Sequence, residues 1–224
     1  MFPNTILNER LNKNSKPFLV VHGIYKTVDY EPVSFNDDKI HVLYAGTYDP
    51  NKGGALASVK AAEFLDDRYH LHITGFGGKE LEDGVRNEVE QVRPLTKCQI
   101  TFHGYLDDAQ FLDLMHHCTI GLCTQDPTSK LNLTSFPSKI LNYMANGLVV
   151  LSGRNRAIEE SAVADLLYYY DQQEPKAMAE TVMNISKPDV GEGRLRLMEL
   201  NEKFEVELIK LLKYKNASDK QSCY

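Results

Sequence analysis

The 224-residue sequence contains no tryptophan, few cysteines, and no apolar run near the roughly 20 residues that a membrane-spanning helix needs. The cysteines lack the spacing of metal or redox motifs, so we interpret them as reduced thiols of a cytoplasmic protein. They are Cys98, Cys118, Cys123 and Cys223. No basic and then apolar stretch follows Met1, so we also expect no secretory signal.

Basic side chains are in the minority, with 25 Lys and Arg against 31 Asp and Glu, and the formal net charge is −6. A chain with this balance lacks the overall basic character that attracts nucleic acid or anionic membrane surfaces, so we expect no nucleic-acid partner. The content of 42% hydrophobic and 25% charged residues is ordinary for a globular protein.

What the sequence does contain is a regular alternation of short apolar runs with amphipathic segments from residue 40 onward. The apolar runs predict strands over 40–45, 69–74, 98–103, 119–123, 148–151 and 166–170. The amphipathic segments between and after them predict helices over 53–65, 79–92, 107–118, 137–146 and 175–185. Such alternation is typical of a Rossmann-like α/β fold, a parallel sheet with helices on both faces. Ligands of these sheets bind beyond the carboxyl ends of the strands.

The two ends of the chain have a different character. The run KPFLVVHGIY predicts a further strand over 16–25, and the polar residues 26–38 predict a linker. At the other end, apolar residues at helical spacing predict a long amphipathic helix over 194–213, followed by a disordered tail over 214–224. Its apolar side consists of Leu197, Leu200, Phe204, Leu208 and Leu211. We therefore divide the chain into 1–38, a main domain over 39–187, and 188–224.

The most informative segment is TSFPSKILNYMANGLVVLS, residues 134–152. Pro137 suits a first helical turn, Gly147 ends the helix, and a buried strand follows. A helix N-terminus offers unpaired N–H groups and a positive dipole end to an anion, and Lys139 adds a charge beside it. The simpler alternative is a crossover helix with an ordinary proline start.

Three other loops follow predicted strands and are candidates for ligand contact. GTYDPNKGG (46–54) places Lys52 between glycines, where it either binds a phosphate or is a solvated turn lysine. GFGG (75–78) lacks the full dinucleotide fingerprint, so a nicotinamide dehydrogenase fits poorly. Tyr105 follows a third strand, where it either stacks on a base or merely covers the sheet edge.

The histidines and carboxylates give no comparable signal. His116 and His117 are adjacent on a helix and do not share a face, so they predict no metal site. His41, His70 and His72 lie in or beside strands, and we interpret them as structural. No nucleophile–base set or carboxylate pair follows from the spacing, so the catalytic residues stay unassigned.

Taken in order, these loops resemble the donor-binding half of the retaining group-1 glycosyltransferases of the GT-B fold. The resemblance runs from about residue 40 to 185 and depends on LYAG followed by KGG, then LHITGFG, TFHGYL and FPSKILNYMANGLVVLS. It implies one of two Rossmann-like domains, the C-terminal one, which holds a nucleoside diphosphate sugar. It further implies that no metal or other cofactor is needed, because basic side chains and helix termini stabilise the leaving diphosphate.

The resemblance also implies site residues. Lys52 resembles the diphosphate-binding lysine and Gly46 the glycine before it, while Gly75 and Tyr105 belong to the turns beside the nucleoside. The loop and helix start that contact the sugar and phosphates correspond to Phe136, Ser138 and Lys139.

Three departures from the family pattern fall on the remaining candidate positions. Thr47 stands where an arginine is common, and Thr134 and Asn142 stand in place of paired glutamates. An asparagine can still hydrogen-bond a ribose hydroxyl, but without charge. The start PSK is similar to that of bacterial surface-polysaccharide enzymes.

The resemblance covers only one of the two expected domains. Residues 1–38 then correspond to the end of an acceptor domain and an interdomain linker, and the rest of the acceptor domain is missing. We expect the isolated domain to be inactive, its C-terminal helix to self-associate, and the full-length protein to lie in the cytoplasm, peripheral to the inner membrane. The alternatives are a non-catalytic nucleotide-binding module of the same fold and, more remotely, a nucleotide-sugar epimerase.

Overall fold

The computed structural model describes residues 1–27, 33–50, 52, 54–129, 132, 134–185 and 191–221, with backbone alone for 214–221. Its centre is a six-stranded parallel sheet in the order β3-β2-β1-β4-β5-β6. The strands are β1 (Ile40–Thr47), β2 (Tyr69–Phe76), β3 (Gln99–Gly104), β4 (Ile120–Cys123), β5 (Val149–Gly153) and β6 (Leu167–Tyr170). The predicted Rossmann-like α/β fold is confirmed.

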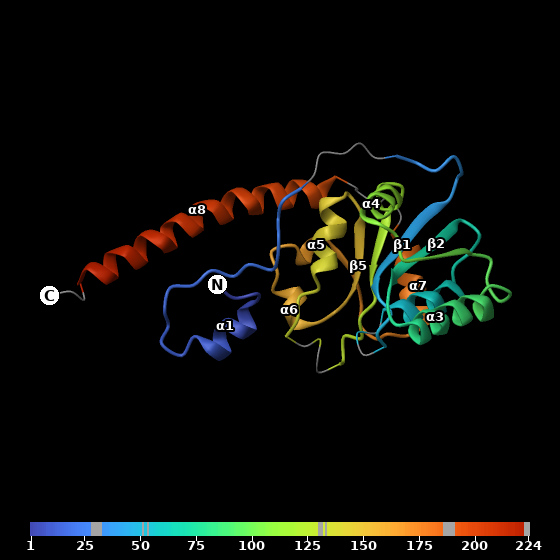
Figure 1. Ribbon diagram of the computed structural model, residues 1–224, viewed down its shortest axis with the longest axis horizontal. Coiled ribbons are helices and arrows are strands. Elements are labelled where there is room, and N and C mark those ends of the chain that lie inside the picture. The colour runs from blue at the N-terminus through green and yellow to red at the C-terminus, as the bar shows by residue number, and fades with distance from the viewer. Residues whose placement is uncertain are drawn as a thin grey trace.

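Helices cover both faces of this sheet (Figure 1). One core lies under α2 (Ala55–Ala62), α3 (Lys79–Val92) and α7 (Pro175–Met183), and contains side chains from alternate positions of the strands, such as Val42, Tyr44, Leu71 and Ile73. The other core lies under α4 (Asp108–His116), α5 (Ser138–Ala145) and α6 (Arg156–Glu159), and contains Leu43 and Val150. A short 3₁₀ turn, Ala164–Leu166, precedes β6.

Local sequence explains where the important helices begin and end. Asp107 accepts a hydrogen bond from the Gln110 N–H, and the Gln110 side chain accepts one from the Asp107 N–H, which forms a capping box at α4. Gly147 has φ +82°, a left-handed conformation that favours glycine, directly after α5. The predicted start of α4 and the predicted end of α5 before Gly147 are therefore confirmed, whereas Pro137 is the N-cap of α5 rather than part of its first turn.

The N-terminal region differs from the prediction. The strand expected over 16–25 is wrong, because this run makes only an isolated bridge, from Val20 to Phe2, and joins no sheet. Leu19 and Tyr25 are nevertheless buried, although neither belongs to a helix or a strand. A helix that the sequence analysis missed, α1 (Thr5–Leu11), begins at Asn4, whose side chain accepts a hydrogen bond from the Leu7 N–H.

The C-terminal helix α8 (Glu192–Gln221) is longer than expected and extends away from the body (Figure 1). It continues to Gln221, residues 222–224 lie outside the described part, and the disordered tail over 214–224 stays a prediction. Leu197 is fully buried, whereas further apolar side chains are exposed: Leu195, Met198, Val206, Ile209 and Leu212. Self-association through this helix stays a prediction.

Two expectations about what the sequence lacks can be compared with the structure. Cys98, Cys118 and Cys123 are free and buried, and burial raises the pKa of each thiol. Within the described residues, no helix is both long enough and apolar enough to cross a membrane.

Candidate functional site

A hollow of about 590 Å³ lies at the carboxyl end of β1. It sits where the strand order reverses between β1 and β4, which is the position at which open parallel sheets bind ligands. Its walls come from the chain before β1, from the ends of β1 and β2, from the loop after β4 and from α5. The lining residues are Gly23, Ile24, Lys26, Tyr44, Ala45, Gly46, Thr47, Lys52, Phe76, Gln125, Ser138, Lys139, Leu141, Asn142 and Ala145.

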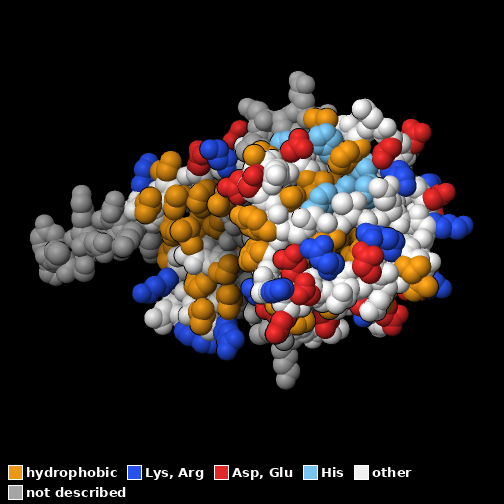
Figure 2. Space-filling model, turned by 45° about the vertical axis from the view of Figure 1, so that its right-hand side comes forward, with side chains coloured by type: hydrophobic (Ala, Val, Ile, Leu, Met, Phe, Trp, Pro, Cys, Tyr) orange, Lys and Arg blue, Asp and Glu red, His pale blue; other side chains and the backbone are white. Residues whose placement is uncertain are grey.

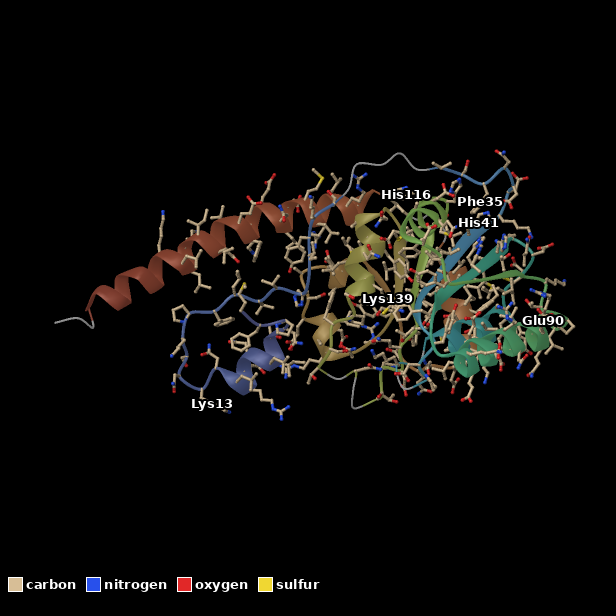
Figure 3. All side chains as sticks on the ribbon, viewed as in Figure 1. Lys13, Phe35, His41, Glu90, His116 and Lys139 are labelled. Carbon is tan, nitrogen blue, oxygen red and sulfur yellow. The ribbon has the colours of Figure 1, made fainter. Side chains whose placement is uncertain are left out.

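Helix α5 presents its first turn to this hollow. Pro137 is its N-cap and provides no side-chain hydrogen bond, so the first N–H groups have no capping side chain. Ser138 and Lys139 line the hollow directly, and Lys139 is labelled beside α5 in Figure 3. The amino end of α5 therefore brings backbone donors and a lysine to the same place.

The Lys139 ammonium has an unusual environment. Its Nζ lies 4.4 Å from the centroid of the Tyr44 ring, a cation–π contact, and burial lowers its pKa below the usual range. Within the described residues, no carboxylate lies within ion-pair distance of Lys139. A mostly buried cation without an acidic partner is a favourable position for an anionic ligand.

Two further lysines line the same hollow, Lys26 from the N-terminal region and Lys52 from the turn after β1. No aspartate or glutamate is among the described lining residues, although the chain as a whole carries a net charge of −6. The local charge is thus opposite to the global one, which favours an anion at this position.

Two glycines provide the space that this arrangement needs. A Cβ added to Gly46 would lie 2.7 Å from Lys139 Nζ, so any side chain there would displace the ammonium. A Cβ on Gly75 would lie 1.8 Å from the Gly46 carbonyl oxygen, because β1 and β2 approach closely there. Gly46 therefore positions the lysine, and Gly75 allows the two strand ends to pair.

A second hollow, of about 270 Å³, adjoins the first and shares Gly46, Lys139 and Asn142 with it. At the start of α4 it is lined by Leu106, Phe111 and the carboxylate of Asp108, and elsewhere by Gly75 and Tyr105, among others. Tyr105 is 71% exposed, so its ring is available to a ligand.

The structure thus brings most of the predicted site residues together. The two hollows are lined by Gly46, Thr47, Lys52, Gly75, Tyr105, Ser138, Lys139 and Asn142. Asn142 is exposed and borders both hollows. Thr47 lines the larger hollow, and its carbonyl accepts a 2.9 Å hydrogen bond from the Tyr44 hydroxyl.

The other two predicted residues do not line these hollows. The Thr134 carbonyl accepts a 2.7 Å hydrogen bond from the Asn4 side chain, and the Phe136 ring lies 4.8 Å from that of His22. Both contact the N-terminal region, so a donor-sugar contact by either stays a prediction. Gly53 of the lysine loop lies outside the described residues.

Lys26 and Gln125 are two polar lining residues that sequence reasoning missed. Lys26 was assigned to a linker, and Gln125 was not considered individually. Gln125 Oε1 is buried and has no hydrogen-bond partner within the described residues. An unpaired buried acceptor beside a cavity is available to a ligand donor such as a hydroxyl. Only its position after a strand, in the predicted loop 124–139, could have indicated it.

A sequence model of the family "Glycosyl transferases group 1" matches residues 39–187. No curated protein matches the chain.

Three solved structures of low sequence identity share the fold. A glycosyltransferase from Rickettsia africae is 15% identical, with a TM-score of 0.56, over 79% of this chain and 49% of that chain. Anabaena Alr3699/HepE in complex with UDP is 15% identical, with a TM-score of 0.57, and the match covers 81% of this chain and 49% of that chain. The third structure is the C-terminal domain of LpcC, a glycosyl transferase group 1 family protein from Francisella tularensis. It is 15% identical, with a TM-score of 0.55, and the match covers 75% of this chain and 94% of that chain. The chain thus spans about half the length of the first two and nearly all of the third.

Proposed function

The chain belongs to the group 1 glycosyl transferases, and on that premise we propose that residues 39–187 bind the nucleoside diphosphate sugar of a sugar-transfer reaction. The observation that carries the proposal is the larger hollow, where Lys26, Lys52 and Lys139 surround the amino end of α5 without a described carboxylate. A diphosphate fits this charge and these backbone donors.

The two hollows suggest an orientation for the donor. The smaller one, with Tyr105 and Phe111, suits the base, and the larger one suits the diphosphate and the sugar. Asn142 borders both, where a ribose hydroxyl would lie, and the unpaired Gln125 oxygen can accept a hydrogen bond from a sugar hydroxyl. Anabaena HepE, which shares the fold, was solved with UDP, and this agrees with a uridine nucleotide as the first probe.

The chemistry that follows is stabilisation of a leaving group. As the bond from the sugar to the diphosphate breaks, negative charge accumulates on the diphosphate oxygens. Lys139 and Lys52, with the α5 N–H groups, would stabilise that charge in a partly water-excluded hollow. The basic side chains take the place that a metal ion has in other transferases, and we propose that the site needs none.

The acceptor requires a second domain in this proposal. The chain spans about half the length of two similar structures, so we propose that the complete enzyme supplies an acceptor domain facing the hollows. We propose a saccharide or lipid-linked acceptor of bacterial surface polysaccharide, because of the PSK start of α5, and a location at the cytoplasmic side of the membrane.

The metal-free site gives the direct test of this function. We expect UDP or GDP to bind the isolated chain with the same affinity in the presence and absence of a chelator, because lysines and helix N–H groups neutralise the diphosphate. Titration calorimetry measures this, with added Mg²⁺ as the comparison. Binding that disappears with chelator would contradict the metal-free site, and no binding of any nucleoside diphosphate would contradict the function.

Lys52 should contribute less than its motif suggests. Its side chain is exposed in a turn, and exposed charge contacts contribute about 0.2–1 kcal/mol, so Lys52→Ala should weaken UDP binding by no more than about fivefold. The thermal melt should stay close to the wild type, because surface substitutions change stability by less than about 0.5 kcal/mol. Lys60→Ala, at an exposed position on α2, is the matched control. Equal affinities for the two variants would show that Lys52 is an ordinary solvated lysine.

A further inference from the structure

Three buried histidines meet on one face of the sheet, away from the two hollows. His41 lies near the amino end of β1, and His70 and His72 lie in the first half of β2. His41 pairs in register with His70, and His72 is two residues further on, so all three point to the same face. Histidine side chains gather on the face that Figure 2 shows. The three are only 4%, 8% and 3% exposed, and a nitrogen of each lies within 4.8 Å of one in each of the others.

The outer nitrogen of each ring is held by a neighbouring side chain. His41 Nε2 lies 2.8 Å from Asp37 Oδ1, and His70 Nε2 lies 2.8 Å from Thr101 Oγ1. His72 Nδ1 lies 3.0 Å from His103 Nε2. Metal-binding histidines almost always have such an outer partner, which fixes the tautomer and the orientation of the ring.

The inner nitrogens face one another. His41 Nδ1 and His72 Nε2 share a hydrogen bond of 2.9 Å, so an ion that binds both nitrogens would displace the proton between them. The Asp37 carboxylate accepts a hydrogen bond from His41 Nε2, so Nδ1 is the His41 nitrogen that faces the cluster. The three rings therefore present one nitrogen each to a common space. Neutral imidazoles are the form that binds metal ions.

We propose that His41, His70 and His72 bind one transition-metal ion, for which Zn²⁺ is the best-fitting probe. A tetrahedral ion with bonds of about 2.0–2.1 Å needs ligand nitrogens about 3.3 Å apart, which lies between the 2.9 Å and 4.8 Å found here. All three ligands are imidazoles, a set that suits Zn²⁺ and its neighbours but not Mg²⁺ or Ca²⁺, which prefer oxygen.

A path of entry reaches the cluster on the His41 side. The Phe35 ring lies 4.1 Å from that of His41 and covers the cluster. A separate hollow of about 260 Å³, lined in part by Phe35, Asp37 and His41, reaches the cluster from the amino end of the strands. The ion would link β1 to β2 there, with water as fourth ligand, so its role is to stabilise the sheet rather than to contact the nucleotide.

The test is a Zn²⁺ titration of the chelator-treated chain by calorimetry, with the thermal melt measured alongside. We expect one Zn²⁺ per chain and a raised melting temperature for the wild type. His72→Gln should weaken binding more than about 100-fold, since it removes a ligand, and Asp37→Asn about 10–100-fold, since it removes an outer partner. His22→Gln is the matched control, because His22 lies against Phe136 outside the cluster and should leave binding unchanged.

Co²⁺ provides an independent readout, because its visible absorption reports nitrogen coordination in the wild type without any substitution. Weak Zn²⁺ binding by the wild type, or equal binding by the wild type and His72→Gln, would overturn the proposal. So would an equal loss in His22→Gln. If His72→Gln fails to fold, the Zn²⁺ affinity of Asp37→Asn tests the proposal instead, because the Asp37 side chain is 39% exposed and its substitution disturbs the core little. Unchanged Zn²⁺ affinity in that variant would also overturn the site.

Discussion

A donor such as a UDP-sugar, incubated with the 224-residue chain and a saccharide acceptor, is expected to remain unconsumed while UDP itself binds normally. The physical reason is positioning. Holding two reactants in line contributes about 7–11 kcal/mol to lowering a barrier, and the chain spans about half the length of two similar structures. Without a second domain to hold the acceptor, we expect the transfer rate to fall by about five orders of magnitude or more.

The measurement is release of UDP and formation of glycosylated product, followed by mass spectrometry across several donors. The matched control is the same residues preceded by an acceptor domain in a two-domain chain, which should turn over. Turnover by the 224-residue chain alone, at a rate typical of complete enzymes, would contradict the need for a second domain. Binding without turnover in the two-domain chain would favour the non-catalytic module.

Lys139→Met should change affinity and stability in opposite directions. Loss of a charge-assisted contact of about 1.5–3 kcal/mol lowers UDP affinity by about 10–100-fold. The methionine keeps an apolar stem against Tyr44 but removes a cation whose pKa burial lowers. Because the fold disfavours that charge, the free energy of unfolding without ligand should stay equal or increase.

The pH dependence of stability gives a second test of the role of Lys139. A lysine with a lowered pKa binds fewer protons in the folded than in the unfolded chain as the pH rises through the folded-state value. Stability of the wild type relative to Lys139→Met should therefore increase toward alkaline pH.

Lys176→Met is a suitable control for the Lys139 variant. Lys176 lies exposed on α7, and its substitution removes the same charge. It should change neither UDP affinity nor the pH profile. A Lys139→Met variant that melts much earlier than the wild type, or one that binds UDP equally well, would show that the ammonium stabilises the fold rather than a ligand.

The sheet and its main helices could be predicted because their signals are local. The apolar runs at β1, β2 and β5, the capping box at Asp107 and the stop at Gly147 each depend on residues close in sequence. The run at 16–25 has the same local signal, but a strand also needs a neighbouring strand. Val20 finds only Phe2, which no periodicity in the sequence shows.

The site residues that could be predicted are likewise those with a local sequence signal. Gly46, Lys52 and Lys139 follow strands or start a helix, and their positions in the loops indicated a shared edge. Lys26 reaches the hollow from a segment before the sheet, and the Gln125 oxygen is recognisable only by its missing partner. Neither fact is contained in a motif, because both depend on how distant segments approach each other.

The exposed rim of the hollows has a consequence for spectroscopy. Phe76 and Tyr105 are 59% and 71% exposed, and both line the smaller hollow. Because the chain contains no tryptophan, Tyr105→Trp would introduce a single indole whose emission comes from this rim alone. The fold thus offers a site for a fluorescent reporter of nucleotide occupancy with no tryptophan background from the two cores.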